Sequence, residues 1–258
     1  MSCFDLHTHT TWCDGKNTPE EMARAAVEKG LDTLGFSGHS YTFFDESYCM
    51  PRFAQGYRRE IAALREKYAP RLRILCGVEQ DYYSLEPTEG YDFVIGSAHY
   101  LRLGEDYVPV DETPEILRAA AEKYFAGDIY ALTECYFSTV AGVAEKTGAD
   151  IVGHFDLIAK FNERERLFDE AHPRYRTAWQ TAAEALLKAG RPFEINTGAI
   201  SRGYRTKAYP APEMIEFIRS HGGRFVRSSD SHSAATLCYG FEEFDWLGEA
   251  LIDCWPPR

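Results

Sequence analysis

The stretch Asp5-Leu6-His7-Thr8-His9-Thr10 (DLHTHT) places two histidines one residue apart, directly after a short apolar segment. Alternate residues of a β-strand face the same side of a sheet, so both imidazoles would point the same way. They are either two half-buried histidines bonded to backbone or two ligands of one metal ion. Short motifs often match by chance, so the rest of the chain has to separate these interpretations.

Short apolar segments alternate with amphipathic helical patterns along the chain. Strands are expected at residues 3–6, 33–36, 72–78, 93–97, 151–152, 192–195 and 224–227. Helices are expected at about 18–29, 53–68, 114–125, 129–146, 175–189, 212–221 and 244–252. This alternation predicts an α/β fold with a mostly parallel sheet, either doubly wound or closed into a barrel.

Histidines and acids collect just after these expected strands. Six of the eight histidines are among them. The full set is His7, His9, Asp14, His39, Glu79, His99, His154, Asp230 and His232. Because the carboxyl ends of parallel strands meet on one face, these side chains are expected in one site. Mixed nitrogen and oxygen ligands suit zinc, iron or manganese, and nine ligands are enough for two or three ions.

Composition limits the partners and the compartment. The 258 residues include 28 basic and 40 acidic side chains, a formal charge of −12, which disfavours a nucleic-acid polymer but not a small anionic substrate. Seven cysteines without a Cys-x-x-Cys motif indicate reduced thiols rather than a disulfide framework. No secretory signal or membrane span is recognisable, so we expect a cytoplasmic protein.

The ordered motifs HTH, CDG, FSGHS, GVEQD, GSAHY, VGHFD and SSDSH resemble the polymerase-and-histidinol-phosphatase (PHP) family. NTGAISRG, at residues 196–203, resembles its histidinol-phosphate phosphatases. The resemblance implies a distorted (β/α)7 TIM-like barrel, a single domain over residues 1–258. It also implies three metal ions (zinc, manganese and/or iron) held by the nine residues above. Glu79 would bridge two ions, with His7, His9 and Asp230 at one site and His39 and His232 at another. Many family members have Asp where this chain has Gly38.

The implied reaction is hydrolysis of L-histidinol phosphate to L-histidinol and phosphate, a step of histidine biosynthesis. A metal-bridging hydroxide would attack phosphorus. Asp230 either handles a proton or serves only as a ligand. Arg202, Lys160 and Arg205 lie in the loops near strand ends and could contact the phosphate, and guanidinium groups in particular match its geometry. The aromatic and acidic residues of 41–45 could line the pocket or form a lid packed on its own loop.

Three alternatives stay open. A PHP phosphoesterase for nucleotides or another small phosphate ester would use the same ligands. An amidohydrolase-like barrel that cleaves C–N bonds also begins with His-x-His, but it often uses a bridging lysine carbamate, and no lysine here follows a strand convincingly. A metal-dependent binding module would need no open polynuclear centre. The oligomeric state is left open.

Overall fold

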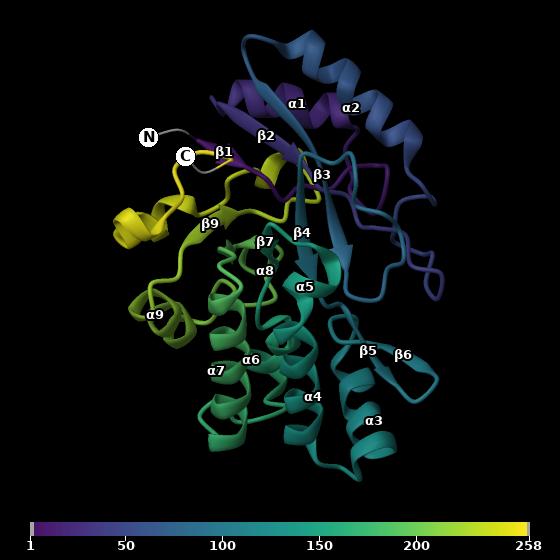
Figure 1. The fold of residues 1–258 in the computed structure, drawn as a ribbon, viewed down its shortest axis with the longest axis vertical. Coiled ribbons are helices and arrows are strands. Elements are labelled where there is room, and N and C mark those ends of the chain that lie inside the picture. Colours follow the sequence, from purple (N-terminus) through teal and green to yellow (C-terminus); the bar gives the residue numbers. More distant parts are fainter. Residues whose placement is uncertain (1–2, 257–258) are drawn as a thin grey trace.

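The computed structural model describes residues 3–256 and centres on seven parallel strands (Figure 1). Their order in the sheet is β1-β2-β3-β4-β7-β8-β9, so each strand pairs with the next one along the chain, apart from the β5–β6 insertion. The strands are β1 Phe4–Asp5, β2 Thr33–Phe36, β3 Arg73–Asp81, β4 Phe93–Ser97, β7 Ile151–Val152, β8 Phe193–Asn196 and β9 Phe225–Ser228.

The sheet closes on itself just beyond β1 and β9. Thr8 and Ser231 form a parallel bridge. The His9 N–H donates to the Ser231 carbonyl at 2.9 Å, and the Ser231 N–H donates to the His7 carbonyl at 3.1 Å. The result is a nearly closed, distorted barrel, which confirms the predicted (β/α)7 TIM-like fold and excludes the doubly wound sheet.

Helices cover the outside of this barrel. In Figure 1, α1 and α2 pack together on one side, and α3, α4 and α7 lie side by side on another. The α-helices are α1 Pro19–Glu28, α2 Gln55–Tyr68, α3 Pro114–Phe125, α4 Ile129–Ala141, α5 Val143–Thr147, α6 Asn162–Glu165, α7 Pro173–Lys188, α8 Gly198–Ser201 and α9 Pro212–Ser220. Thr18 and Glu21 cap α1 reciprocally, a capping box that stabilises its first turn.

The structure departs from the sequence-based elements in several places, which include the short helices α6 and α8 given above. Residues 129–146 form two helices that meet at Gly142. A hairpin of β5 Tyr100–Leu103 and β6 Asp106–Pro109 was not predicted. The expected C-terminal helix is a 3₁₀ segment, η3 Phe241–Ala250, with a kink at Gly248, whose backbone adopts a non-helical conformation with φ 54° and ψ −123°. Two further 3₁₀ turns are η1 Leu157–Ala159 and η2 Ala234–Thr236.

Apolar side chains from several strands fill the barrel below its carboxyl-terminal end. Leu6, Phe93, Ile95 and Val226 are buried together in this cluster. Ile252 and Trp255 from the C-terminal segment join them. That segment pairs with the beginning of β9, where the Ile252 N–H donates to the Phe225 carbonyl at 2.8 Å. It therefore closes the end of the barrel at which the strands begin.

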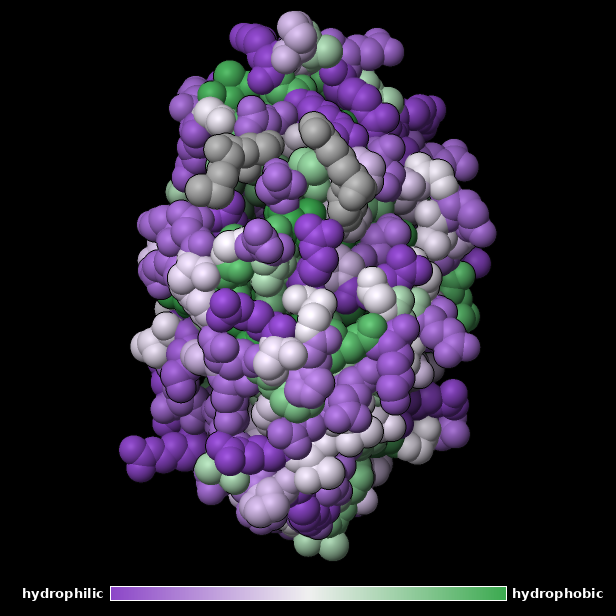
Figure 2. Space-filling model, turned by 60° about the vertical axis from the view of Figure 1, so that its left-hand side comes forward, coloured by the Kyte–Doolittle hydropathy of each residue, from purple (hydrophilic) through white to green (hydrophobic). Residues whose placement is uncertain are grey.

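The face shown in Figure 2 is predominantly hydrophilic, with apolar residues in small, separated groups. No helix within residues 3–256 is long and apolar enough to cross a membrane. All seven cysteines are free thiols, as their number and spacing predict.

Gly153 permits the close approach of β7 to β4. A Cβ atom at this position would overlap the Ser97 hydroxyl. That hydroxyl donates to Glu79 Oε1 at 2.7 Å. The absence of a side chain at Gly153 thus preserves a contact that orients Glu79 at the carboxyl end of the barrel.

We predict that Gly153→Ala lowers the free energy of unfolding by about 1–3 kcal/mol, because overpacking of a close contact forces neighbours to move. Gly142→Ala is the matched control: its added Cβ would lie 3.4 Å from the nearest atom, the Tyr82 hydroxyl, at a helical φ of −91°. There we expect a change within about 1 kcal/mol, in the stabilising direction. Denaturant unfolding measures both, and equal effects would contradict the argument.

Candidate metal centre

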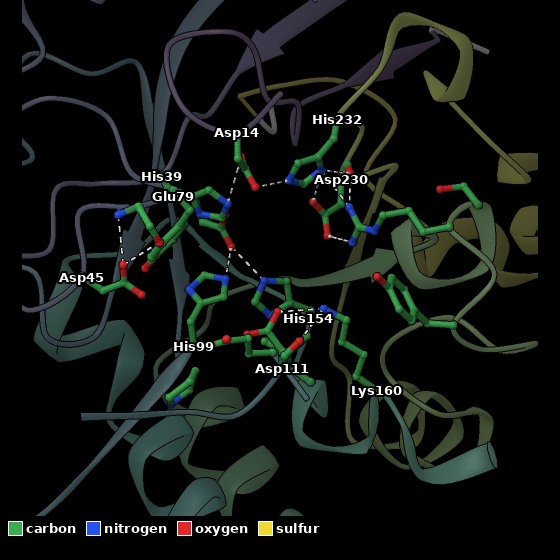
Figure 3. A pocket seen from close by; sticks show the side chains of 18 of the residues that line it. Asp14, His39, Asp45, Glu79, His99, Asp111, His154, Lys160, Asp230 and His232 are labelled. Atoms are coloured by element: carbon green, nitrogen blue, oxygen red, sulfur yellow. Dashed lines mark hydrogen bonds and ion pairs between the residues drawn. The ribbon is translucent and has the colours of Figure 1, made fainter. Parts of the chain in front are cut away.

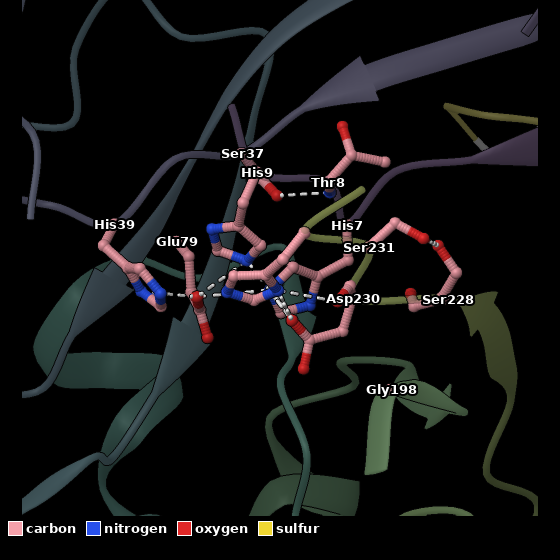
Figure 4. Close-up of polar contacts among 12 residues, drawn as sticks. His7, Thr8, His9, Ser37, His39, Glu79, Gly198, Ser228, Asp230 and Ser231 are labelled. Atoms are coloured by element: carbon pink, nitrogen blue, oxygen red, sulfur yellow. Dashed lines mark hydrogen bonds and ion pairs between the residues drawn. The ribbon is translucent and has the colours of Figure 1, made fainter. Parts of the chain in front are cut away.

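Glu79 of β3 is the centre around which the predicted ligands gather (Figure 4). Its Oε2 lies 2.8 Å from His39 Nδ1, 3.2 Å from His7 Nε2 and 3.6 Å from His9 Nε2. Its Oε1 lies 2.8 Å from His154 Nε2 and 3.2 Å from His99 Nε2. One buried carboxylate therefore faces five imidazoles, which come from the segments that follow four strands, β1, β2, β4 and β7.

The other predicted residues complete the ring (Figure 3). Asp230 Oδ1 lies 3.3 Å from His9 Nε2, and Asp14 Oδ2 lies 3.0 Å from His232 Nε2. Three groups have ligand atoms close enough together to hold one ion each. They are His7, His9 and Asp230; His9, Asp14, His39 and His232; and His39, Glu79 and His99. All nine residues singled out in the sequence thus converge at one site.

Unpaired polar atoms show that this cluster suits cations. Among the described residues, His7 Nε2, His9 Nε2 and Glu79 Oε2 are buried without a hydrogen-bond partner. A buried polar atom left unpaired costs about 1–3 kcal/mol, and a bound cation would satisfy all three. The mixture of imidazole nitrogens and carboxylate oxygens is the donor set of zinc, manganese and iron. The residues therefore fit the metals that the sequence implies.

At Glu79 and His9, the electrostatics of the cluster favour the protonation states that metal ligands need. Burial disfavours the charged form of Glu79, but His7, His99 and His39 outweigh it and hold its pKa well below the usual range. Burial, reinforced by His232 and His39, lowers the pKa of His9 to about 3. Glu79 is therefore anionic and His9 is neutral at physiological pH, with a lone pair free to bind a cation.

Gly38, directly before His39, is closely packed by neighbouring side chains. A Cβ atom there would lie 2.9 Å from Met50 Sδ and 3.4 Å from Cys13 Sγ. Met50 is buried at 1% exposure. The space beside His39 is thus filled by the Met50 side chain, which leaves no room for a carboxylate at position 38.

A cavity of about 680 Å³ opens over the cluster. Arg202 and Lys160 line it. Arg202 donates from Nη2 to Asp230 Oδ2 at 3.0 Å, and its Nη1 lies 2.7 Å from His232 Nδ1. Lys160 donates to the Asp111 carbonyl at 2.7 Å and to Asp111 Oδ2 at 3.0 Å.

Arg205 does not line the cavity, which corrects the expectation that it contacts the phosphate. It is 3% exposed. Its Nη1 donates to Asp156 Oδ2 at 3.2 Å, and its Nε lies 3.7 Å from Glu163 Oε1. A buried guanidinium requires a paired anion, so Arg205 serves the ion pair beneath the loop rather than the substrate.

Of residues 41–45, for which the sequence left open a cavity lining or a lid packed on its own loop, Asp45 lines the cavity. Ser47 and Tyr48 line it as well. Phe44 instead stacks on Tyr107 of the hairpin, with ring centroids 3.9 Å apart and parallel planes. The loop is thus one wall of the cavity and is fixed in place by aromatic packing.

Two buried acids behind the histidines were missed in the sequence. Glu194 Oε1 lies 2.6 Å from His7 Nδ1. Asp81 Oδ2 accepts from the His99 N–H at 3.0 Å and lies 3.3 Å from His99 Nδ1. The feature of the sequence that could have revealed them is an acid within an otherwise apolar strand, Glu194 in FEIN and Asp81 at the end of GVEQD.

Comparisons with known proteins agree with this arrangement. The family model "PHP domain" matches residues 5–198, and the chain belongs to this family. It is 30% identical over 255 residues to the "Probable histidinol-phosphatase" of Deinococcus radiodurans, covering 93% of this chain and 90% of the relative. It is 25% identical to the protein of the same name from Schizosaccharomyces pombe, covering 83% and 74%.

A solved structure shares the fold. It is the histidinol phosphate phosphatase of Lactococcus lactis, determined in complex with zinc, L-histidinol and phosphate. The TM-score is 0.73 at 19% identity, over 96% of this chain and 94% of that one. This similarity extends the agreement in architecture over nearly the whole of both chains.

We predict that Glu79→Gln weakens metal retention more than about 10-fold, because it removes the charge shared by five imidazoles. Elemental analysis after exhaustive buffer exchange measures the ions kept per chain. Asp45→Asn is the control, since Asp45 lines the same cavity outside the three ligand groups. Equal metal loss in both variants would show that Glu79 has no special place among the carboxylates.

Proposed function

We propose that this chain is a metal-dependent phosphomonoesterase that hydrolyses L-histidinol phosphate to L-histidinol and phosphate. The observation that carries the proposal is the convergence of nine potential ligands around Glu79 in a cavity that also presents Arg202 and Lys160. The names of the Deinococcus and Schizosaccharomyces relatives and the ligands of the Lactococcus structure support this choice of substrate.

The metals belong to the proposal as well. We assign up to three divalent ions, zinc, manganese or iron, to the three ligand groups defined above. Bound there, they would supply an activated water, orient the phosphoryl oxygens and neutralise charge on the leaving oxygen. His7, His9, Asp14, His39, Glu79, His99, His154, Asp230 and His232 are the proposed ligands.

Arg202 and Lys160 bind the phosphate in this proposal. A guanidinium carries five N–H donors, and the contacts of Arg202 to Asp230 and His232 use only part of them. Lys160 has three donors, two of which go to Asp111. Each cation thus keeps capacity for a phosphoryl oxygen while its protein partners fix its position.

Asp230 acts as a ligand rather than as a proton carrier. Its Oδ1 faces His9 Nε2 at 3.3 Å, and its Oδ2 accepts from Arg202 Nη2 at 3.0 Å and from Asn196 Nδ2 at 3.3 Å. A carboxylate that accepts from a guanidinium and an amide on one oxygen is held in its anionic form. It is therefore a poor proton donor for the leaving alcohol.

The remaining cavity wall suits the cationic part of histidinol. The Asp45 carboxylate accepts from the Tyr100 hydroxyl at 2.6 Å and from the Ser47 N–H at 2.9 Å, and both residues line the cavity with it. Its position is thus set before any substrate arrives. A cavity of about 680 Å³ matches a small ligand, which favours this ester over a nucleic-acid polymer.

The alternatives differ in what this cavity would require. A nucleotide phosphatase would use the same metals, so substrate preference decides. For a C–N hydrolase of the amidohydrolase type, a lysine carbamate would have to join the cluster, but Lys160 is paired with Asp111. A metal-dependent binding module would need neither several adjacent ligand groups nor the cations Arg202 and Lys160 beside them.

A substrate panel tests the function directly. With purified, metal-loaded protein, we expect phosphate release from L-histidinol phosphate to exceed that from nucleoside monophosphates and p-nitrophenyl phosphate by at least about 100-fold in kcat/KM, or ~2.7 kcal/mol. The reason is that only the first substrate offers a cation to Asp45. Comparable rates across the panel would refute the substrate assignment while leaving phosphatase activity intact.

A second prediction concerns Arg202. We expect Arg202→Ala to lower kcat/KM about 10- to 100-fold, as expected for loss of a hydrogen bond to a charged group worth about 1.5–3 kcal/mol. Arg202→Lys should recover only part of this, since an ammonium cannot form the bidentate contact. Arg176→Ala, a surface arginine paired with Glu213, is the control. Metal content is measured alongside, and unchanged kinetics in Arg202→Ala would remove this residue from the phosphate site.

A further inference from the structure

Strand β8 differs from the other barrel strands within residues 3–256: none of the nine proposed ligands lies in it or directly after it. Its inner side is nevertheless polar. Glu194 and Asn196, two residues apart, are 1% and 0% exposed. Between and before them, Ile195 and Phe193 face the apolar core. Burial of a carboxylate and an amide is costly unless both are fully bonded, so their partners indicate their purpose.

Glu194 binds residues on two neighbouring ligand segments. Its Oε1 lies 2.6 Å from His7 Nδ1, and both side chains have no exposed surface. Its Oε2 accepts from the backbone N–H of His154 at 3.0 Å. One carboxylate therefore fixes the ring of His7 and the backbone position of His154.

Asn196 extends this network to β9. The Gly198 N–H donates to its Oδ1 at 2.9 Å, which defines the orientation of the amide. Its Nδ2 is then directed to Glu194 Oε2 at 3.2 Å and to Asp230 Oδ2 at 3.3 Å. The Asn196 N–H donates to the Tyr209 carbonyl at 2.7 Å, and the Tyr209 N–H donates to the Asn196 carbonyl at 3.0 Å. The amide thus links the carboxylate behind His7 to the carboxylate of Asp230.

The contact to His7 has a chemical consequence. An imidazole that donates its Nδ1–H to a carboxylate keeps the lone pair on Nε2, and the carboxylate makes that lone pair more basic. His7 Nε2 is buried without a hydrogen-bond partner among the described residues and lies 3.2 Å from Glu79 Oε2. Glu194 therefore directs the free nitrogen of His7 at the space bounded by Glu79 and Asp230.

We propose that Glu194 and Asn196 are positioning residues for the metal centre: Glu194 fixes the tautomer and ring orientation of His7 and the backbone of His154, and Asn196 orients Asp230. The inference rests on the metal centre of the proposed function but not on its substrate. Strand β8 thus contributes no ligand of its own but orients the proposed ligands that follow neighbouring strands.

Metal affinity tests this role apart from turnover. Apo protein is titrated with Zn²⁺ against a chromophoric chelator, and the fold is checked by circular dichroism. We expect Glu194→Ala to weaken the tightest site about 10- to 100-fold, the range for loss of such an outer contact. Glu194→Gln, which keeps an acceptor but not the charge, should lose less. Saturating Zn²⁺ should restore most of kcat in both variants, since a positioning residue is needed to hold the metal rather than to react.

Asp5→Asn is the matched control. Asp5 is also a fully buried carboxylate, but it accepts from Ser229 and Cys238 rather than from a histidine. It should lower stability without weakening Zn²⁺ binding. Parent-like affinity in folded Glu194→Ala and Glu194→Gln, equal weakening in Asp5→Asn, or failure of saturating metal to restore kcat would each overturn the proposal. A parent protein that binds Zn²⁺ but does not hydrolyse L-histidinol phosphate would defeat the proposed function alone.

Discussion

The burial of one negative charge, that of Glu79, is the constraint on which this structure depends. A lone carboxylate at 1% exposure would be strongly unfavourable, so the fold must surround it with groups that compensate it. Five imidazoles do so, and they come from four separate segments of the barrel. The arrangement that compensates the buried charge of Glu79 also directs several imidazole lone pairs at a common space. The same side chains therefore meet the electrostatic requirement of folding and provide the geometry of a metal centre.

Closure of the barrel and assembly of the centre are equally connected. The hydrogen bonds that join the first strand to the last use the backbones of His7, His9 and Ser231. The side chains on either side of these bonds are proposed ligands. The position of His7 and His9 relative to Asp230 therefore follows from the pairing register at the Thr8–Ser231 bridge. A shift of this register by one residue would turn one set of proposed ligands out of the site.

The strand positions and the residues that gather around Glu79 could be predicted because their signals are local: apolar runs for strands and His, Asp or Glu just beyond them. The 100–109 hairpin could not, since its mixed pattern reads as the loop that follows His99. Glu194 was missed because the role of an acid within an apolar strand cannot be inferred before its partner is known, and that partner, His7, lies 187 residues away in the sequence. The prediction that Arg205 contacts the phosphate was wrong for the same reason, because its ion pair with Asp156, 49 residues away in the sequence, is visible only in the folded structure.

The junction between the segments that follow β1 and β9 has a consequence for biosynthesis of the protein. Ligands on the first and last strands share one site, so a ribosome must release nearly the entire chain before the site can form. Until Asp230 and His232 emerge, the nascent polypeptide holds seven of the nine ligands on a sheet whose two edges are unjoined. In the proposed metal centre, the complete set of nine ligands would therefore be available only after the last strand and the segment that follows it have been synthesised.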